Sequence, residues 1–212
     1  MDITNLKYAA QMFRHLNGGH FICATSMDDE KRNWYEALEA GWEDYAKVWL
    51  ATTGMDLARG DGYYFFRKRV SGDRKSFETM ASDYKEYLSI LNLLFQLDQS
   101  FGVGHLITRT WILSRLDMCP PAKEICRNLF NSNTTDEWAT ELLEILEKKM
   151  EIVCSYLDNE RNEIRYLVTQ AFDYYRTFVE SIQFISKEDE QAIEKTPEYT
   201  IAARAPPMFI QC

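Results

Sequence analysis

Residues that make tight turns are scarce in this sequence. Only nine of the 212 residues are glycine and five are proline. Because β-barrels and β-sandwiches need many tight turns, this scarcity argues against an all-β fold and predicts a mainly helical one. A disordered chain is excluded as well, since 46% of the residues are hydrophobic and 14% are aromatic, which is enough to build a core.

Patterns that bind metals or form disulfides are also missing. The five cysteines include no CxxC pair, and their number is odd. His15, His20 and Cys23 lie close together in the sequence, but no second pair of ligands completes a tetrahedral set. Cys119 and Cys126 are interpreted as partly buried thiols. The sequence therefore predicts neither a metal nor a cofactor.

No motif of a known catalytic site occurs. The glycine-containing pieces GDG and GVG lack the length and the Lys-Ser/Thr step of a phosphate-binding loop, and neither a GxSxG motif nor a Cys-His signature is found. Carboxylates are plentiful, but nothing in the sequence brings two of them together in one cleft. We therefore expect a protein that is not an enzyme.

Positive charge is in short supply too. The 24 basic residues are outnumbered by 33 acidic ones, which gives a net charge of -9 at pH 7. An acidic surface repels phosphate backbones and argues against a free-standing nucleic-acid binder. There is no apolar run of membrane-spanning length and no signal peptide in MDITNLKYAA, so we expect a reduced, cytoplasmic protein.

The sequence does contain a helix-rich first segment that ends in a hairpin. Apolar spacing predicts a helix over residues 4–17 and a second helix with an aromatic stripe. The stripe, interpreted as core, consists of Leu38, Trp42, Tyr45 and Trp49. In the hairpin that follows, the residues that alternate on either side of the turn Gly60-Asp61-Gly62 are Met55, Leu57, Tyr63 and Phe65. A helix followed by a two-stranded ribbon is how a winged-helix domain ends, and we assign residues 1–75 to such a domain.

Long helices come next. Residues 76–100 form the longest helical pattern, which becomes apolar nearly all round toward SILNLLFQL. A shorter helix is predicted at Leu106–Leu116. A helix that is apolar all round is buried against neighbours or against another chain. We therefore expect residues 76–118 to link the domains and to form the contact of a homodimer.

The pattern of the first segment returns after the break at Cys119-Pro120-Pro121. An amphipathic helix, a strand, a polar turn over residues 158–162 and another strand predict a second winged-helix domain over residues 119–184. An acidic, proline-containing tail occupies residues 185–212. The predicted fold class is α+β, mainly α with short β-hairpins, in which long helices join two winged-helix domains.

Basic residues lie at the two hairpins. Arg67, Lys68 and Arg69 follow the first hairpin, and Lys148 and Lys149 end the helix that enters the second. In winged-helix proteins this helix and the ribbon meet a duplex, so these five residues are candidate DNA contacts. The other interpretation is a solvated face, because the helix dipole favours lysines near a helix C-terminus.

The order of these features resembles the MukE and MksE family, the Kite-type accessory subunits of bacterial condensins. The first part of the resemblance is LNGGHFI, then the tyrosine-containing helix WYEALEAGWEDYAKVWLATTGMDL, then RGDGYYFFRKR. The second part, LEILEKKMEIVCSYLDNERNEIRYLVTQAFDYY, is similar to the second winged helix of the family. The resemblance spans residues 12–180. The chain departs from a DNA-facing helix at Glu141 and Glu144, where positive charge would be preferred.

The resemblance implies a non-catalytic protein that forms a homodimer. It implies binding to a kleisin subunit, which bridges a pair of SMC-type ATPase heads, and a place at the nucleoid in organising chromosomal or plasmid DNA. The alternative is a winged-helix transcription regulator, which would need a basic DNA-reading helix and would bind its operator without partners. An enzyme of unrecognised type is a third possibility, for which no residue stands out.

Overall fold

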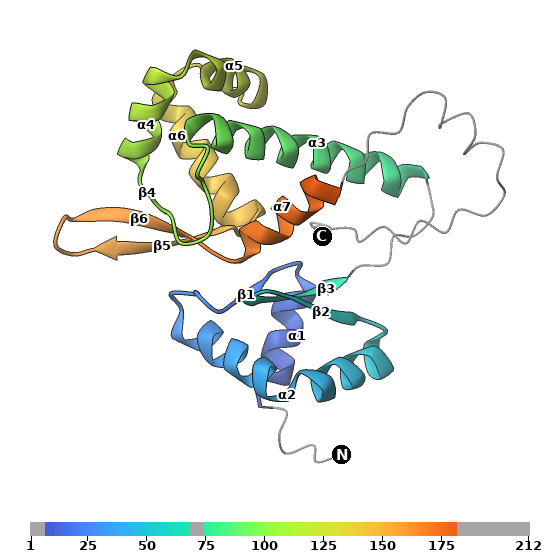
Figure 1. Ribbon diagram of the computed structural model, residues 1–212. Helices are drawn as coiled ribbons and strands as arrows, with labels where there is room; N and C mark the ends of the chain where they lie inside the picture. The colour runs from blue at the N-terminus through green and yellow to red at the C-terminus, as the bar shows by residue number, and fades with distance from the viewer. Residues whose placement is uncertain (1–6, 68–73, 182–212) are drawn as a thin grey trace.

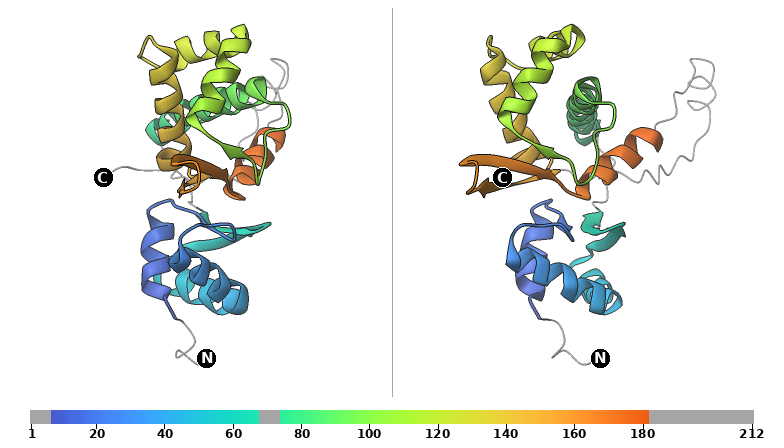
Figure 2. Two further views of the ribbon diagram at one scale, coloured as in Figure 1. Left: turned by 90° about the vertical axis from the view of Figure 1, so that its left-hand side faces the viewer. Right: turned by 60° about the vertical axis from the view of Figure 1, so that its left-hand side comes forward.

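The computed structural model describes residues 7–67 and 74–181, with the side chains of residues 7–67 and 84–180. It is mainly helical with two three-stranded antiparallel sheets, so the predicted α+β class is confirmed. The chain forms two units that lie one above the other in Figure 1 and in both views of Figure 2. We call residues 7–67 the first unit and residues 74–181 the second unit. No helix within these ranges is long and apolar enough to cross a membrane.

The first unit contains two helices and one sheet. Its elements are α1 (Ala9–Asn17), β1 (Ile22–Cys23), α2 (Asp29–Thr53), β2 (Asp56–Gly60) and β3 (Tyr63–Arg67). The strand order is β1-β3-β2, and both pairs of neighbours are antiparallel. The two helices and the hairpin that the sequence predicts are present, although the first helix begins at Ala9. Gly62 takes a left-handed conformation (φ 77°) in the hairpin turn, which favours glycine there.

Helix α2 consists of two helical segments joined at a kink. The side chain of Asp28 caps its start by accepting hydrogen bonds from the backbone N–H groups of Glu30 at 2.8 Å and Lys31 at 3.4 Å. Gly41 has non-helical backbone angles, which divide the helix into two halves. The first unit therefore has the order helix, strand, two consecutive helical segments, hairpin.

Strand β3 is buried on both faces. Tyr64 and Phe66 lie in a core with the helices of the first unit, where the rings of Phe66 and Trp49 meet edge-on with centroids 5.3 Å apart. Tyr63 and Phe65 point to the opposite face and belong to a core shared with the second unit. The alternation expected from the sequence singles out Tyr63 and Phe65, whereas the structure buries all four residues of the run YYFF. A strand between two layers explains why all four residues are aromatic.

The second unit repeats this order with two additional helices, one before its hairpin and one after it. Its elements are α3 (Arg74–Leu97), β4 (Leu106–Ile107), α4 (Arg109–Met118), α5 (Pro120–Leu129), α6 (Thr135–Glu144), the π-helical turn η2 (Ile145–Lys149), β5 (Val153–Asp158), β6 (Glu163–Val168) and α7 (Ala171–Ser181). The strand order β4-β6-β5 matches that of the first sheet. Helix α3 and strand β4, which lie in the expected linking segment, therefore share a fold unit with the second hairpin.

The start of the predicted helix at Leu106–Leu116 is wrong. Leu106 and Ile107 form strand β4, which pairs with β6, and the helix begins only after Thr108. The hydroxyl of Thr108 accepts a hydrogen bond from the backbone N–H of Trp111 at 3.1 Å, which caps the helix. The apolar spacing of residues 106–116 fits a helix throughout. The Thr108 cap and the pairing of β4 with β6 determine where the helix begins.

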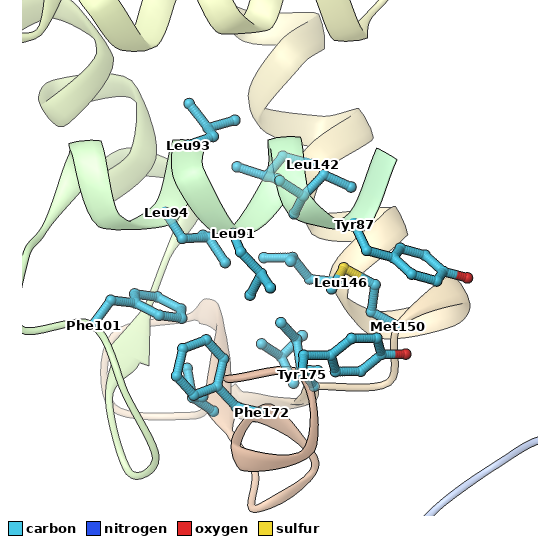
Figure 3. Close-up of a cluster of buried hydrophobic side chains, with 14 of the residues drawn as sticks. Tyr87, Leu91, Leu93, Leu94, Phe101, Leu142, Leu146, Met150, Phe172 and Tyr175 are labelled. Atoms are coloured by element: carbon cyan, nitrogen blue, oxygen red, sulfur yellow. The ribbon is translucent and has the colours of Figure 1, made fainter. Parts of the chain in front are cut away.

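Helix α3 supplies the centre of the core of the second unit. Ile90, Leu93 and Leu94 are fully buried. Figure 3 shows leucines of α3 pointing into the same cluster as Leu146 and Phe172, which come from η2 and α7. The apolar surface over the described side chains of this helix is thus covered within one chain. Burial of α3 therefore requires no second chain, and dimerisation stays a prediction.

Helix α7 of the second unit packs on the free face of the first sheet, as Figures 1 and 2 show. Phe21 is central to this contact, because its ring centroid lies 5.4 Å from that of Tyr174 and 6.2 Å from that of Tyr175. The rings of Phe65 and Tyr174 meet edge-on at 4.9 Å. All four side chains are buried, so the two units share one aromatic core.

Replacing Phe21 by alanine should lower the free energy of unfolding by about 3 kcal/mol, because the change leaves a cavity between the two units. Leu50→Ala is the control, since Leu50 is 49% exposed, and it should change the free energy by less than about 1 kcal/mol. Urea unfolding followed by circular dichroism measures both. An unchanged unfolding midpoint for Phe21→Ala would contradict the shared core.

Candidate functional site

Arg67, the first of the candidate DNA contacts, ends strand β3. Its guanidinium lies 3.4 Å from a carboxylate oxygen of Asp56 on the paired strand β2. Lys68 and Arg69, which the sequence groups with Arg67, lie outside the described residues. Both partners of the pair are about half exposed, and an exposed pair of this kind contributes little to stability. Arg67 can therefore exchange Asp56 for a phosphate at small cost.

Lys148 and Lys149 end the turn η2, and each contacts a carboxylate. The Lys148 ammonium lies 3.2 Å from Glu144, one helical turn earlier, and the Lys149 ammonium lies 2.5 Å from Glu86 on α3. Lys149 also lies over the ring of Tyr87, 5.8 Å from its centroid. The described candidate contacts thus meet acidic side chains rather than one another.

Acidic residues dominate the helix and hairpin at which these lysines lie. Residues 135–168, which include α6, η2, β5 and β6, contain nine acidic and four basic side chains, a net charge of -5. More than half of the net charge of -9 therefore resides in this one segment. A duplex that approached it would meet a repulsive potential.

A cleft of about 430 Å³ lies between the two units, beside their aromatic contact. The first unit lines it with Ser26 to Asp28 of the loop before α2 and with Lys31 of α2, and the second with Glu147, Glu151 and residues 153–156 of strand β5. Strand β5 is at the edge of its sheet, so its outer backbone groups have no strand partner among the described strands. Met27 on the opposite wall is 42% exposed. The cleft thus combines a free strand edge with an apolar anchor, the features that bind an extended polypeptide.

Glu151 connects the two units at one side of this cleft. Its backbone takes the left-handed conformation (φ 53°), which is uncommon for a residue other than glycine. Its carboxylate accepts a hydrogen bond from the backbone N–H of Phe21 at 3.1 Å and pairs with Nδ1 of His20. A residue of the second unit therefore holds the start of strand β1 in the first.

Gln170 holds the other end of the same strand. Its side-chain oxygen accepts hydrogen bonds from the hydroxyl of Thr25 at 2.6 Å and from the backbone N–H of Thr25 at 3.3 Å. The backbone of Gly62 passes so close that a Cβ there would lie 2.8 Å from Cγ of Gln170. We call the contacts of Glu151 and Gln170 with residues 20–25 the clasp. Together with the Phe21 ring they fix the position of one unit on the other.

His15 supports the clasp from within the first unit. Its Nε2 lies 3.0 Å from the backbone carbonyl oxygen of Phe21, and its ring stacks on that of His20 with centroids 4.8 Å apart. Burial lowers the pKa of His15 to about 4, and the nearby ammonium of Lys31 acts in the same direction. His15 is therefore neutral at pH 7 and donates its N–H to the carbonyl group.

The residues weighed as metal ligands do not form a ligand set. Nε2 of His15 is used by a carbonyl group, and Nδ1 of His20 by Glu151. Burial raises the pKa of the Cys23 thiol to about 12, which disfavours the thiolate that a metal would need. In the part of the chain that the structure describes, no group of three or more His, Cys, Asp or Glu side chains could hold a metal.

The clasp residues were not identified from the sequence. Glu151 and Phe21 are 130 residues apart, and Gln170 and Thr25 are 145 apart, so no local pattern links them. Glu151 resembles any acidic residue before a strand. The one available signal is the run YYFF, because a strand with aromatic side chains on both faces must be covered on both.

The fold and the cleft define an α+β protein of two related units that share an aromatic core, with a hairpin in each. No curated protein matches the chain. A family model described as condensin complex protein MksE matches residues 7–180. The chain therefore belongs to the MksE family and is an accessory subunit of a condensin complex. The resemblance to this family that the sequence suggested is confirmed.

The stability of the protein should fall as the pH drops from about 6.5 to about 4. The folded pKa of His15 lies below the unfolded value of 6.5, so the unfolded chain binds the proton first. This side chain should cost about 2 to 3 kcal/mol at pH 4 and nothing above about pH 7.5. Urea unfolding across this pH range measures the loss.

His15→Gln isolates this contribution, because glutamine can still donate to the carbonyl of Phe21 but does not titrate. The variant should lose less stability between pH 6.5 and pH 4 than the unchanged protein. Titration of acidic residues should change the unfolding free energy of both proteins equally. Identical pH dependence in the two proteins would contradict the assignment of the titration to His15.

Proposed function

We propose that this chain binds a kleisin subunit and, through it, a pair of SMC-type ATPase heads, and that it helps to organise chromosomal or plasmid DNA in the cytoplasm, at the nucleoid. Membership of the MksE family over residues 7–180 is the observation that carries the proposal. The subunit is proposed to be non-catalytic. A transcription regulator would need a positive reading surface, and the charge of -5 over residues 135–168 argues against one there.

Each unit is proposed to be a winged-helix domain. Both have the order helix, short strand, helices, hairpin, and the two sheets have the same strand order. In the first unit, the kink at Gly41 divides α2 into the two helices that this fold requires. In the second unit, α5 is an additional helix. The proposed first domain spans residues 1–75. Residues 76–118 are proposed to link the domains and to contribute most of α3, with β4 and α4, to the second domain, which residues 119–184 complete.

The cleft between the units is proposed to hold an extended segment of the kleisin. Its free strand edge at β5 can pair with the backbone of a partner, and Met27 can contact an apolar side chain of the segment. A homodimer is also proposed, on family membership alone. Its contact would lie away from the covered face of α3.

Met27→Asp should weaken binding of the purified kleisin by at least about tenfold, because a carboxylate cannot be buried against an apolar side chain. Met118→Asp is a matched control, since Met118 is 82% exposed and lies on α4, outside the cleft. Isothermal titration calorimetry with the full-length kleisin gives both affinities. Equal loss in both variants, or no loss in Met27→Asp, contradicts the assignment of the cleft.

DNA is proposed to contact the protein within the complex. Arg67, Lys68 and Arg69 are the leading candidates, because the hairpin segment 55–69 contains four basic and two acidic residues. Lys148 and Lys149 remain candidates with smaller expected effects, since both contact carboxylates. The free protein should bind a duplex weakly at its net charge of -9, and more tightly when the kleisin and the ATPase are present.

Reversing the charges of Arg67, Lys68 and Arg69 to glutamate should flatten the plot of log affinity against log salt concentration by about 3 units for the complex. Lys148→Glu with Lys149→Glu should flatten it by about 1 unit or less. Fluorescence anisotropy of a labelled duplex across a salt series measures the slopes. Tight, sequence-specific binding by the free protein would favour the transcription regulator, and an unchanged slope for the first set would refute its DNA contact.

A further inference from the structure

The hairpin of the second unit carries an exposed apolar pair at its outer end. Leu157 and Ile164 lie directly opposite each other in the register of β5 and β6 and are 56% and 53% exposed. Four residues inward on the same face, Val153 and Val168 are buried in the core. The pair therefore continues the core-facing side of the sheet beyond the helices that cover it. Figure 1 shows the hairpin projecting past these helices.

The end of this hairpin is held in one conformation. The side chain of Asp158 accepts hydrogen bonds from the backbone N–H groups of Glu160 at 3.0 Å and Arg161 at 3.3 Å, which close the turn. On the face opposite the apolar pair, Arg165 lies 3.0 Å from a carboxylate oxygen of Asp158. Both side chains of this ion pair are mostly buried. The apolar pair is thus presented by a rigid ribbon, which lowers the entropic cost of binding.

The charge around the pair is negative. Arg165 and Lys148 each pair with an acidic residue of the same segment, so both are already counted in the net charge of -5 over residues 135–168. From outside the segment, Arg109 of α4 pairs with Asp136 near the start of α6. Acidic side chains of η2 and α6 lie close to the same face: burial and then the charges of Glu147 and Glu144 raise the pKa of Tyr166, two residues from Ile164, while the ammonium of Lys148 acts in the opposite direction. An occupant of this face must therefore bring positive charge and apolar side chains together.

Three kinds of occupant fail this requirement. A duplex and an anionic lipid surface would both be repelled by the acidic residues. A second copy that used the same face would place two segments of charge -5 against each other.

The first hairpin is different, since residues 55–69 have a net charge of +2 and its strand β3 is buried on both faces. The two hairpins of this chain are therefore not equivalent surfaces.

We propose that the face formed by Leu157, Ile164 and the acidic side of α6 and η2 is a docking surface for a basic polypeptide segment with at least two apolar side chains. The segment belongs to another subunit of the condensin complex, and in this respect the proposal rests on the proposed function. The apolar pair of the docking face lies outside the cleft between the units, because neither Leu157 nor Ile164 lines that cleft, whereas Glu147 borders both.

A synthetic peptide of alternating Leu-Leu and Lys-Arg pairs tests the chemistry of the face in the full-length protein. Leu157→Ser with Ile164→Ser should weaken its binding by at least about tenfold, because two half-exposed apolar contacts are lost. Leu50→Ser with Met118→Ser is the control, at two other exposed apolar residues, and should bind as the unchanged protein does. Circular dichroism verifies the fold of each variant. Equal affinity in the hairpin variant and the control overturns the proposal.

Purified partner subunits distinguish this proposal from the proposed function. If the unchanged protein binds the kleisin or the ATPase and the hairpin variant binds at least about tenfold more weakly, the proposal is supported. If both bind equally, the docking face is wrong while the proposed function stands. If the unchanged protein binds neither subunit, the proposed function fails, and so does the assignment of the docked segment to another subunit of the complex. Loss of duplex binding in the hairpin variant, with peptide binding retained, would also overturn the docking face.

Discussion

A three-stranded sheet with aromatic side chains on both faces cannot leave either face in water. Strand β1 has only two residues, so it adds little hydrogen bonding to the hairpin of β2 and β3 in the first sheet. Helices α1 and α2 cover one face, and α7 of the second unit covers the other through Phe21, Phe65 and Tyr174. This packing sets the positions of the two hairpins and leaves the cleft open beside it. The cleft therefore exists because the two units pack on each other through this aromatic core.

The sequence predicts the elements of this structure better than their assembly. Turn chemistry places the first hairpin at Asp61 and Gly62, and the polar turn after Asp158 places the second, because both signals are local. The pairing of Glu151 with Phe21 joins chain segments 130 residues apart. It also depends on the left-handed backbone of Glu151, which an acidic residue in the sequence does not predict. The burial of α3 was anticipated, but periodicity does not say whether the covering surface belongs to the same chain.

The two units show how one arrangement of elements supports different surfaces. Their sheets have the same strand order, yet strand β3 of the first hairpin is buried on both faces and is followed by basic residues, while the second hairpin ends in exposed apolar side chains amid acidic ones. Backbone similarity therefore does not transfer a DNA-binding role from one unit to the other. The charges and the exposed side chains of each hairpin decide which kind of partner it can meet.

The distance along the chain between the first sheet and the helix that covers it affects how the protein is made. A ribosome finishes β3 about a hundred residues before α7, which takes about 5 to 20 seconds at usual rates of synthesis. During this interval Phe21, Tyr63 and Phe65 form an aromatic face with no cover from their own chain. Exposed apolar surface of this kind makes an incompletely folded chain prone to aggregation. Synthesis that pauses before residue 171 would prolong its exposure to aggregation.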